Sequence, residues 1–228
     1  MEVAHDAACV TEAAEPIRFL FDYVSPYAYL AWTQVHALAE RHLRRVEPVP
    51  VLFAALLNAH GHKGPAEIPP KRAYIFKHVL RTAHRLGVLL TPPPSHPFNP
   101  LLALRASSLP MPDATRRAFI DTLYAATWGG GPGVERPDVI ARLATQVGLD
   151  GNEVVSNAQS PMAKERLRGQ TDEALRAGVF GVPTILVGNE LFWGYDAFPD
   201  VDQYLRGEDP VSPTDLARWA DLPATAQR

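Results

Sequence analysis

The sequence has almost no cysteine, since Cys9 is the single one in 228 residues. One thiol cannot form an intramolecular disulfide framework, and a zinc site built from several cysteines is also excluded. Long hydrophobic runs are missing too, because no apolar stretch approaches the roughly 18 residues of a membrane-spanning helix. Positive charge is not in excess. The formal net charge of -3 and the isoelectric point of about 6.2 argue against a general electrostatic hold on nucleic acid.

The composition that is present is ordinary for a globular protein, with 46% hydrophobic and 21% charged residues. It excludes intrinsic disorder over the whole chain and supplies enough apolar residues for a core. The length fits one domain, or one domain that carries a large insertion. Residues 1–15 are acidic and lack both a basic start and a sustained apolar stretch, so they do not resemble a signal peptide. We expect them to form a flexible leader, and we expect a cytoplasmic location.

The start of the chain predicts a strand, a helix and a second strand. Residues 17–23 are aromatic and branched, as in a buried strand. Ser25-Pro26 provides an N-cap followed by a proline at the first helical position, and apolar residues recur at helical spacing to about Arg41. Residues 46–53 return to a strand-like run that contains two prolines. The first part of the chain is therefore a βαβ unit.

The middle of the chain is predicted to be helical, and strands return near its end. Helical patterns with proline, asparagine or glycine at their ends cover residues 69–86, 99–107, 113–128, 137–147 and 160–177. Residues 184–187 and 190–193 flank Gly188-Asn189, which predicts a hairpin with a two-residue turn. A short helix over residues 200–205 follows.

The order βαβ, helices, ββα is the layout of an α/β thioredoxin-like fold with a large all-helical insertion. We predict that residues 16–57 and 171–208 form the thioredoxin-like domain and that residues 58–170 form the helical insertion domain. Residues 209–228 are predicted to be a C-terminal tail with one helical turn near Leu216.

Two positions are candidates for chemistry in this layout. Ser25 lies where a strand passes into a helix, and the free N–H groups and positive dipole end of that helix stabilise a bound anion such as a thiolate. A plain N-cap accounts for the same serine. The second position is Val182-Pro183, which directly precedes a buried strand. If this bond is cis, the backbone N–H and C=O of Val182 are left free for an extended peptide ligand.

The histidines and the glycine run do not predict a metal or phosphate site. His60 and His62 are two residues apart, and no carboxylate stands at ligand spacing beside a histidine pair, which favours a solvated loop. The glycine run at residues 129–133 lacks the Gly-Lys-Ser/Thr of a phosphate-binding loop and does not follow a strand. It predicts the end of a helix and a loop.

Four stretches together resemble the 2-hydroxychromene-2-carboxylate isomerase family: FDYVSPYAYLAW at residues 21–32, IPPKRAY at 68–74, HPFNPLLALR at 96–105 and GVFGVPTILVGNELFWGYD at 178–196. That family is related to kappa-class glutathione transferases and to bacterial disulfide oxidoreductases of the DsbA type, which carry an inserted helical domain. The resemblance extends over about residues 17–205 and implies a DsbA-like thioredoxin fold.

The resemblance also implies glutathione as cofactor and Ser25 as the catalytic residue. The oxidoreductase relatives have Cys-x-x-Cys where Ser25-Pro26-Tyr27-Ala28 stands here, so dithiol exchange through this protein is impossible. In the isomerases and kappa transferases the matching serine hydrogen-bonds the sulfur of glutathione. The other implied glutathione-binding residues are Lys71, His62, Val182, Pro183, Tyr195 and Asp196.

The implied roles differ among these residues. Val182, before the family's cis proline, pairs with the cysteinyl backbone of glutathione, Asp196 receives the γ-glutamyl ammonium, and Lys71 contacts the acidic groups. Without the resemblance, Lys71 is a solvated helix charge and Asp196 a turn residue. His62 stands where the family usually has an asparagine, and its charge would vary near neutral pH. The stretch at residues 128–134 also departs from the family and is expected to shape a different substrate pocket.

The implied function is a glutathione-dependent cis-trans isomerase in aromatic compound catabolism. Its small-molecule substrate would be a conjugated aromatic carboxylate, isomerised by reversible thiolate addition, bond rotation and elimination. Two alternatives remain open. One is a kappa-like transferase that keeps the adduct, and the other is a non-catalytic thioredoxin-fold module that binds extended peptides beside Pro183. Relatives are commonly dimers, so a homodimer is possible, whereas no metal, nucleic acid or membrane partner is expected.

Overall fold

The structure is a computed structural model that describes residues 14–220, 222 and 223. Cys9, nearly all of the predicted leader, and residues 221 and 224–228 of the predicted tail lie outside the described residues. Nothing in the described part of the chain is a helix long and apolar enough to cross a membrane.

A four-stranded mixed sheet forms the base of the fold, in the order β2–β1–β3–β4. β1 (Ile17–Phe21) pairs in parallel with β2 (Val46–Pro50) and antiparallel with β3 (Thr184–Val187), and β3 pairs antiparallel with β4 (Glu190–Trp193). The crossover between the parallel strands is α1 (Pro26–Arg41), as the βαβ pattern predicts. β2 contains two prolines that cannot donate ladder hydrogen bonds, and its place at the edge of the sheet accommodates them.

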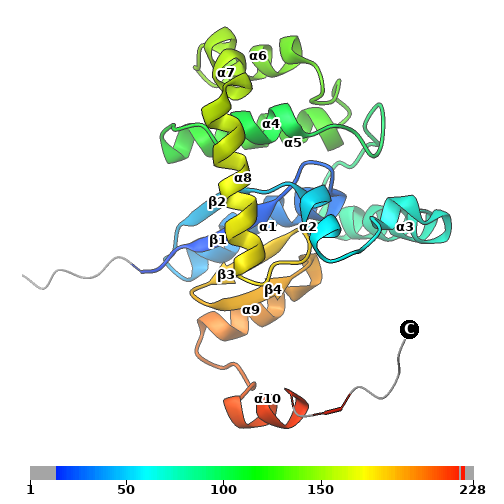
Figure 1. Cartoon of the computed structure of the whole chain (residues 1–228), viewed down its shortest axis with the longest axis vertical. Coiled ribbons are helices and arrows are strands. Elements are labelled where there is room, and N and C mark those ends of the chain that lie inside the picture. Colours follow the sequence, from blue (N-terminus) through cyan, green and yellow to red (C-terminus); the bar gives the residue numbers. More distant parts are fainter. Residues whose placement is uncertain (1–13, 221, 224–228) are drawn as a thin grey trace, which may run out of the picture.

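The alternation of side chains along β1 separates two cores. Phe19 and Phe21 belong to the core that includes α1 and the helical insertion. Leu20 points to the opposite face and packs in a smaller core against α2 (Phe53–Ala59) and α8 (Pro161–Arg176). Both faces of the sheet are therefore covered by helices, and in Figure 1 α8 crosses the sheet on the viewer's side.

The helical insertion lies on one side of the sheet in Figure 1, apart from α3, which projects laterally. Its helices are α3 (Pro69–Leu86), α4 (Leu101–Ser107), α5 (Asp113–Trp128), α6 (Pro137–Gln146) and α7 (Gly151–Gln159), with the short 3-10 helix η1 (Pro65–Glu67) before α3. α8 connects both parts, because it contacts α4 and α7 as well as α2 and β2. The predicted boundary between residues 170 and 171 falls inside this continuous helix, and the division into domains stays a prediction.

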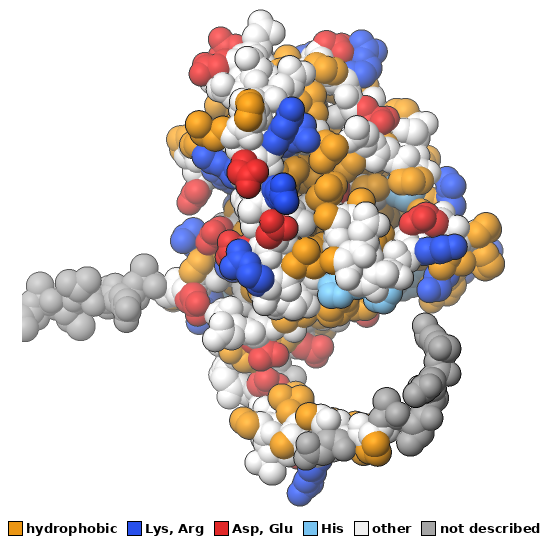
Figure 2. All heavy atoms as spheres, in the orientation of Figure 1, with side chains coloured by type: hydrophobic (Ala, Val, Ile, Leu, Met, Phe, Trp, Pro, Cys, Tyr) orange, Lys and Arg blue, Asp and Glu red, His pale blue; other side chains and the backbone are white. Residues whose placement is uncertain are grey.

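After the hairpin come the 3-10 helix η2 (Tyr195–Ala197), α9 (Phe198–Leu205) and α10 (Pro213–Ala220). α9 packs against β4, whereas α10 contributes no buried residue and is set apart from the other elements in Figure 1. Figure 2 shows hydrophobic side chains on the surface of this separate segment.

The secondary structure differs from the prediction at several places. Residues 51–53 are not strand, because β2 ends at Pro50 and Phe53 begins α2, a helix that the sequence pattern did not predict. α7 was not predicted either, although Asp150 caps it by accepting from two backbone N–H groups. The tail forms the two-turn helix α10 instead of one turn.

Candidate active site

Ser25 occupies the N-cap position of α1, at the end of the loop that follows β1. Its Oγ accepts a hydrogen bond from the Ala28 N–H at 3.2 Å, and Pro26 is the first residue of the helix. The side chain is nearly buried, with 8% of the residue exposed. The N-cap interpretation of this serine is therefore correct, and whether it also acts on a ligand depends on what lies next to its hydroxyl.

The neighbour of the Ser25 hydroxyl is the turn before β3. Ser25 Oγ donates to the carbonyl oxygen of Val182 at 3.4 Å, across 157 residues of sequence. The Val182–Pro183 peptide bond is cis, as the resemblance implies. Within residues 14–220, the N–H of Val182 has no hydrogen-bond partner, because the ladder of β3 begins at Thr184. A backbone donor and a hydroxyl thus lie together at the positive end of α1.

The loop before Ser25 is held by a buried carboxylate. Asp22 is 1% exposed, and its two oxygens accept from the N–H groups of Val24 at 3.0 Å and Phe53 at 2.9 Å. The Ser25 N–H donates back to the Asp22 carbonyl at 3.1 Å. Burial raises the pKa of Asp22 to about 7, against the lowering effect of the two backbone N–H groups.

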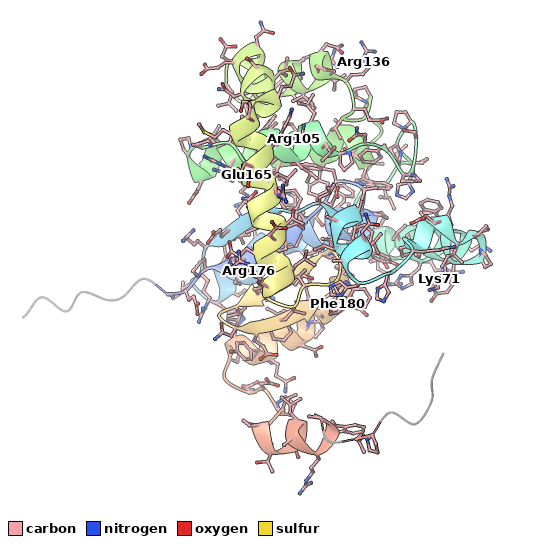
Figure 3. All side chains as sticks on the ribbon, in the orientation of Figure 1. Lys71, Arg105, Arg136, Glu165, Arg176 and Phe180 are labelled. Atoms are coloured by element: carbon pink, nitrogen blue, oxygen red, sulfur yellow. The ribbon has the colours of Figure 1, made fainter. Side chains whose placement is uncertain are left out.

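The hydroxyl of Tyr27 links α1 to α3 beside this loop. It is hydrogen-bonded to Nδ1 of His78 at 2.7 Å, and the rings of His78 and Tyr74 lie parallel with centroids 6.0 Å apart. One face of α3 carries three side chains spaced three and four residues apart, namely Lys71, Tyr74 and His78. The face of α3 that carries Lys71 is therefore turned toward the start of α1. Figure 3 shows Lys71 near the outer end of α3, as an exposed side chain.

Tyr195 and Asp196 lie on η2, which contacts α1. Burial first, and then the charges of Tyr74 and Asp196, raise the pKa of Tyr27 to about 12. Asp196 is exposed and Tyr195 is half-buried. Both line a hollow of about 390 Å³ between η2, α9 and the later turns of α1. A second hollow, of about 380 Å³, lies on the α5 side of α1 and includes His36.

His62 is exposed in the loop after α2, and its neighbour His60 makes the contact with the segment before Val182. Its ring centroid lies 6.1 Å from that of His60, and Nε2 of His60 donates to the Val179 carbonyl at 3.4 Å. The loop thus approaches the segment before Val182, on which Figure 3 labels Phe180. No group of three or more His, Cys, Asp or Glu side chains suited to a metal ion occurs among the described residues.

The structure brings Ser25, Val182 and Pro183 together. Tyr195 and Asp196 lie on η2, which contacts α1 and follows Gly194, whose N–H donates to the Pro183 carbonyl at 2.9 Å. In the described chain no hydrogen bond or ion pair joins Lys71 or the His62 side chain to these residues. The roles of all seven residues in binding a ligand stay predictions.

The sequence-based set missed the residues that hold the site. Asp22, Tyr27 and His96 stand inside motifs that carry the family resemblance, but nothing in their local sequence shows their long-range partners. A buried charge between aromatic strand residues is the one local signal that could have singled out Asp22.

Comparisons with known proteins identify the family and the fold of the chain. A family model described as a DSBA-like thioredoxin domain matches residues 16–206. A 2-hydroxychromene-2-carboxylate isomerase of Sphingobium xenophagum is 30% identical over 193 residues, which cover 83% of this chain and 97% of that protein. Glutathione S-transferase kappa 1 of Rattus norvegicus is 23% identical over 224 residues, covering 90% of this chain and 98% of the relative.

A solved structure of selenomethionine 2-hydroxychromene-2-carboxylate isomerase superposes with a TM-score of 0.78 at 25% identity, over 91% of this chain and 99% of that one. These findings confirm the thioredoxin-like fold with its helical insertion and the resemblance carried by the four sequence stretches. The chain belongs to the DSBA-like thioredoxin-domain family and, within it, to the 2-hydroxychromene-2-carboxylate isomerase family.

Proposed function

We propose that this chain is a glutathione-dependent isomerase of a small conjugated aromatic carboxylate of the 2-hydroxychromene-2-carboxylate type. The observation that carries the proposal is the contact between Ser25 Oγ and the Val182 carbonyl at 3.4 Å. It supports the proposal because a hydroxyl donor, the N-terminus of α1 and a free backbone N–H lie close together, so that one bound group would meet all three.

The residues around this contact fit glutathione. A thiolate is stabilised by a hydroxyl donor and by the positive end of a helix, both of which Ser25 and α1 supply. The free N–H of Val182 suits the extended backbone of a peptide ligand. Asp196 is an exposed carboxylate for an ammonium group, and Lys71 is an exposed cation for carboxylates. The relatedness to a protein named glutathione S-transferase kappa supports the same cofactor.

When bound, glutathione supplies the thiolate that adds to a conjugated double bond, allows rotation about the resulting single bond and leaves on elimination. The contribution of this chain is to hold that sulfur as an anion. Ser25 is 92% buried, so its hydroxyl would donate in surroundings of low dielectric, where a charge-assisted hydrogen bond is strong. The N–H groups at the start of α1 add a fixed positive potential that needs no reorganisation.

The test is a pH titration of the ultraviolet absorbance of the glutathione thiolate, free and bound to the protein. A free thiol titrates near about 8.5, and we expect a clearly lower pKa for the bound thiol. Ser25→Ala should remove most of the difference. The matched control is Ser160→Ala, because Ser160 is the N-cap of α8, accepts from the Ala163 N–H at 3.2 Å and also precedes a proline.

Both alanine variants should lose about 1 kcal/mol of unfolding free energy with the lost cap. The thiol pKa should change in Ser25→Ala alone. An unshifted thiol in the wild-type protein would contradict the proposal. With an activated thiol established, product analysis separates the two enzyme classes: an unconjugated rearranged product supports isomerisation, whereas a stable glutathione conjugate would identify a transferase.

A further inference from the structure

Two side chains of the helical insertion donate to the two carbonyls that directly precede Ser25. Nε1 of Trp128 donates to the Tyr23 carbonyl at 2.8 Å, and Nε2 of His96 donates to the Val24 carbonyl at 3.0 Å. These bonds span 105 and 72 residues of sequence. The backbone that carries Ser25 is therefore fixed from the insertion as well as from Asp22.

The bond to Val24 defines the proton position on His96. A carbonyl oxygen only accepts, so Nε2 carries the hydrogen. Nδ1 is then the unprotonated nitrogen of the neutral ring, and within the described chain it is buried without a partner. A proton on that buried atom would have no acceptor, and burial accordingly lowers the pKa of His96, although the bond to the Val24 carbonyl opposes this. His96 thus acts as a neutral donor.

The ring of His96 is held by aromatic neighbours. Its centroid lies 5.4 Å from that of Phe76, in an edge-to-face arrangement, and 5.5 Å from that of Trp128. The backbone carbonyl of His96 accepts from Nη2 of Arg72 at 3.1 Å. The imidazole therefore has little freedom to leave the Val24 carbonyl.

The loop that carries His96 is attached to the glycine-rich stretch after α5, which the proposed function does not otherwise use. The Thr91 N–H donates to the Trp128 carbonyl at 2.7 Å, and Thr91 forms a β-bridge with Gly129. At the other end, Oε2 of Glu135 accepts from the hydroxyl of Ser95 at 2.9 Å, and Oε1 accepts from the N–H of Asn99 at 3.1 Å.

Glycine is required where this stretch folds back on α5. A Cβ at Gly131 would lie 2.6 Å from the Cα of Ala126, which is closer than real Cβ atoms approach backbone. The loop at residues 91–99 is thus hydrogen-bonded to the stretch at residues 128–135. Together they support the backbone segment that precedes Ser25.

We propose that His96 is a positioning residue for Ser25: as a neutral donor to the Val24 carbonyl, held by the loop at residues 91–99, it fixes the serine hydroxyl toward the glutathione sulfur. This inference rests on the proposed function. The contact that acts on the sulfur remains that of Ser25, and His96 acts through the backbone between them.

The experiment measures the pKa of bound glutathione thiol in three variants. His96→Phe keeps an aromatic ring but removes the donor, and His96→Gln keeps a side-chain N–H of similar reach. The control is His36→Phe, because His36 is also partly buried, has an unpartnered buried nitrogen and packs against an aromatic ring, that of Trp32. It lies 11 residues after Ser25 in α1, about 16 Å along the helix.

We expect His96→Phe to raise the thiol pKa by about 1 unit toward the free value, which is about a tenfold loss of thiolate at neutral pH. His96→Gln should restore the wild-type value, and His36→Phe should leave it unchanged. Should His96→Phe fail to fold, Glu135→Ala tests the same support from an exposed position and should raise the thiol pKa in the same direction.

The outcomes are distinguishable. An unshifted thiol in the wild-type protein overturns the proposed function, and the inference with it. A lowered thiol pKa that is the same in wild type, His96→Phe and Glu135→Ala overturns the role of His96 and leaves the proposed function intact. A rise in His96→Phe that His96→Gln does not reverse assigns the effect to lost packing, which also overturns the inference.

Discussion

At the scale of single residues, the loop between β1 and α1 is organised around the carboxylate of Asp22. Its surroundings are aromatic, since the buried side chains of Phe21 and Tyr23 flank it in the chain, and burial, more than the charge of Asp22, raises the pKa of both Tyr23 and Tyr124. A charge in such a place is unfavourable unless it is hydrogen-bonded, and the N–H groups of Val24 and Phe53 compensate it only in part. The raised pKa of Asp22 is the consequence, and it makes the stability of the fold depend on pH.

Asp22→Asn tests this dependence. The pKa of Asp22 rises from 3.8 to about 7 on folding, so the folded chain binds this proton more tightly than the unfolded chain. The resulting stabilisation is fully present below pH 3.8 and is lost as the pH rises through about 7. It is on the order of 4 kcal/mol for a group this deeply buried. We expect the difference in unfolding free energy between wild type and Asp22→Asn to fall over this range.

The measurement is urea unfolding of both proteins at pH 4, 5, 6, 7 and 8, with the wild-type-minus-variant difference plotted against pH. Taking the difference removes the titrations that both chains share, including those of the exposed carboxylates. A difference that stays flat between pH 4 and pH 7 would show that Asp22 is ionised over this whole range and that the raised pKa is wrong.

At the scale of secondary-structure elements, α6 and α7 approach so closely that one position admits glycine alone. A Cβ at Gly151, the first residue of α7, would overlap the carbonyl oxygen of Ala141 in α6. Since backbone atoms of a helix cannot yield as a flexible side chain does, the two helices would have to separate. Gly169, in α8, presents the opposite case, because nothing lies within 4 Å of a Cβ added there.

Gly151→Ala should therefore lower the free energy of unfolding by about 1–3 kcal/mol. Gly169→Ala is the matched control, and it should raise the free energy of unfolding by up to about 1 kcal/mol, because alanine is the better residue in a helix interior. Chemical denaturation of the three proteins at one pH measures both changes. Equal stability of Gly151→Ala and the wild type would show that α6 and α7 are not in close contact.

The elements that the sequence predicted correctly are those with local signals. Gly188-Asn189 defines the turn of the β3–β4 hairpin, and Gly87, with φ of 65°, ends α3 at the predicted residue. α2 has no such signal, because Leu52 cannot cap it. Its first N–H, that of Phe53, is satisfied by Asp22 from 31 residues away.

The same reasoning explains what could be predicted of the site. Ser25 and Val182 were identified from local patterns and from the family resemblance, and the structure brings them together. His96 belongs to a motif that carried the resemblance, but its partner, the Val24 carbonyl, is 72 residues away and no spacing rule connects them. Long-range hydrogen bonds of this kind are set by tertiary packing, and local sequence does not encode them.

At the scale of the whole molecule, the sheet and the helical insertion are joined where the chemistry is proposed. α8 packs against α4 and α7 at one end and against α2 and β2 at the other, as Figure 1 shows. Trp128, at the end of α5, is 1% exposed and donates to the Tyr23 carbonyl. The site thus depends on both parts of the fold, since the backbone before Ser25 receives bonds from the insertion.

α10 is not part of this arrangement, and deleting it tests whether the rest of the fold is independent of it. It contributes no buried residue, and its apolar side chains are exposed, 58% for Leu216 and 73% for Trp219. Among the described residues, the segment from 209 onward contributes no part of the hydrophobic cores and no hydrogen bond to the loop before Ser25, so the test is a deletion of residues 209–228. We therefore expect the midpoint of thermal unfolding to change by less than about 2 °C. The pKa of the bound glutathione thiol should be the same as in the full chain.

The deletion also removes exposed apolar surface, so the shortened chain should associate less at high concentration than the full chain does. Analytical ultracentrifugation over a hundredfold range of concentration measures this, beside the melting curve and the thiol titration. A fall of the unfolding midpoint by 5 °C or more would mean that α10 packs on the body of the fold. In that case Leu216 and Trp219 would be the first side chains to replace, because buried side chains of their size stabilise a fold most.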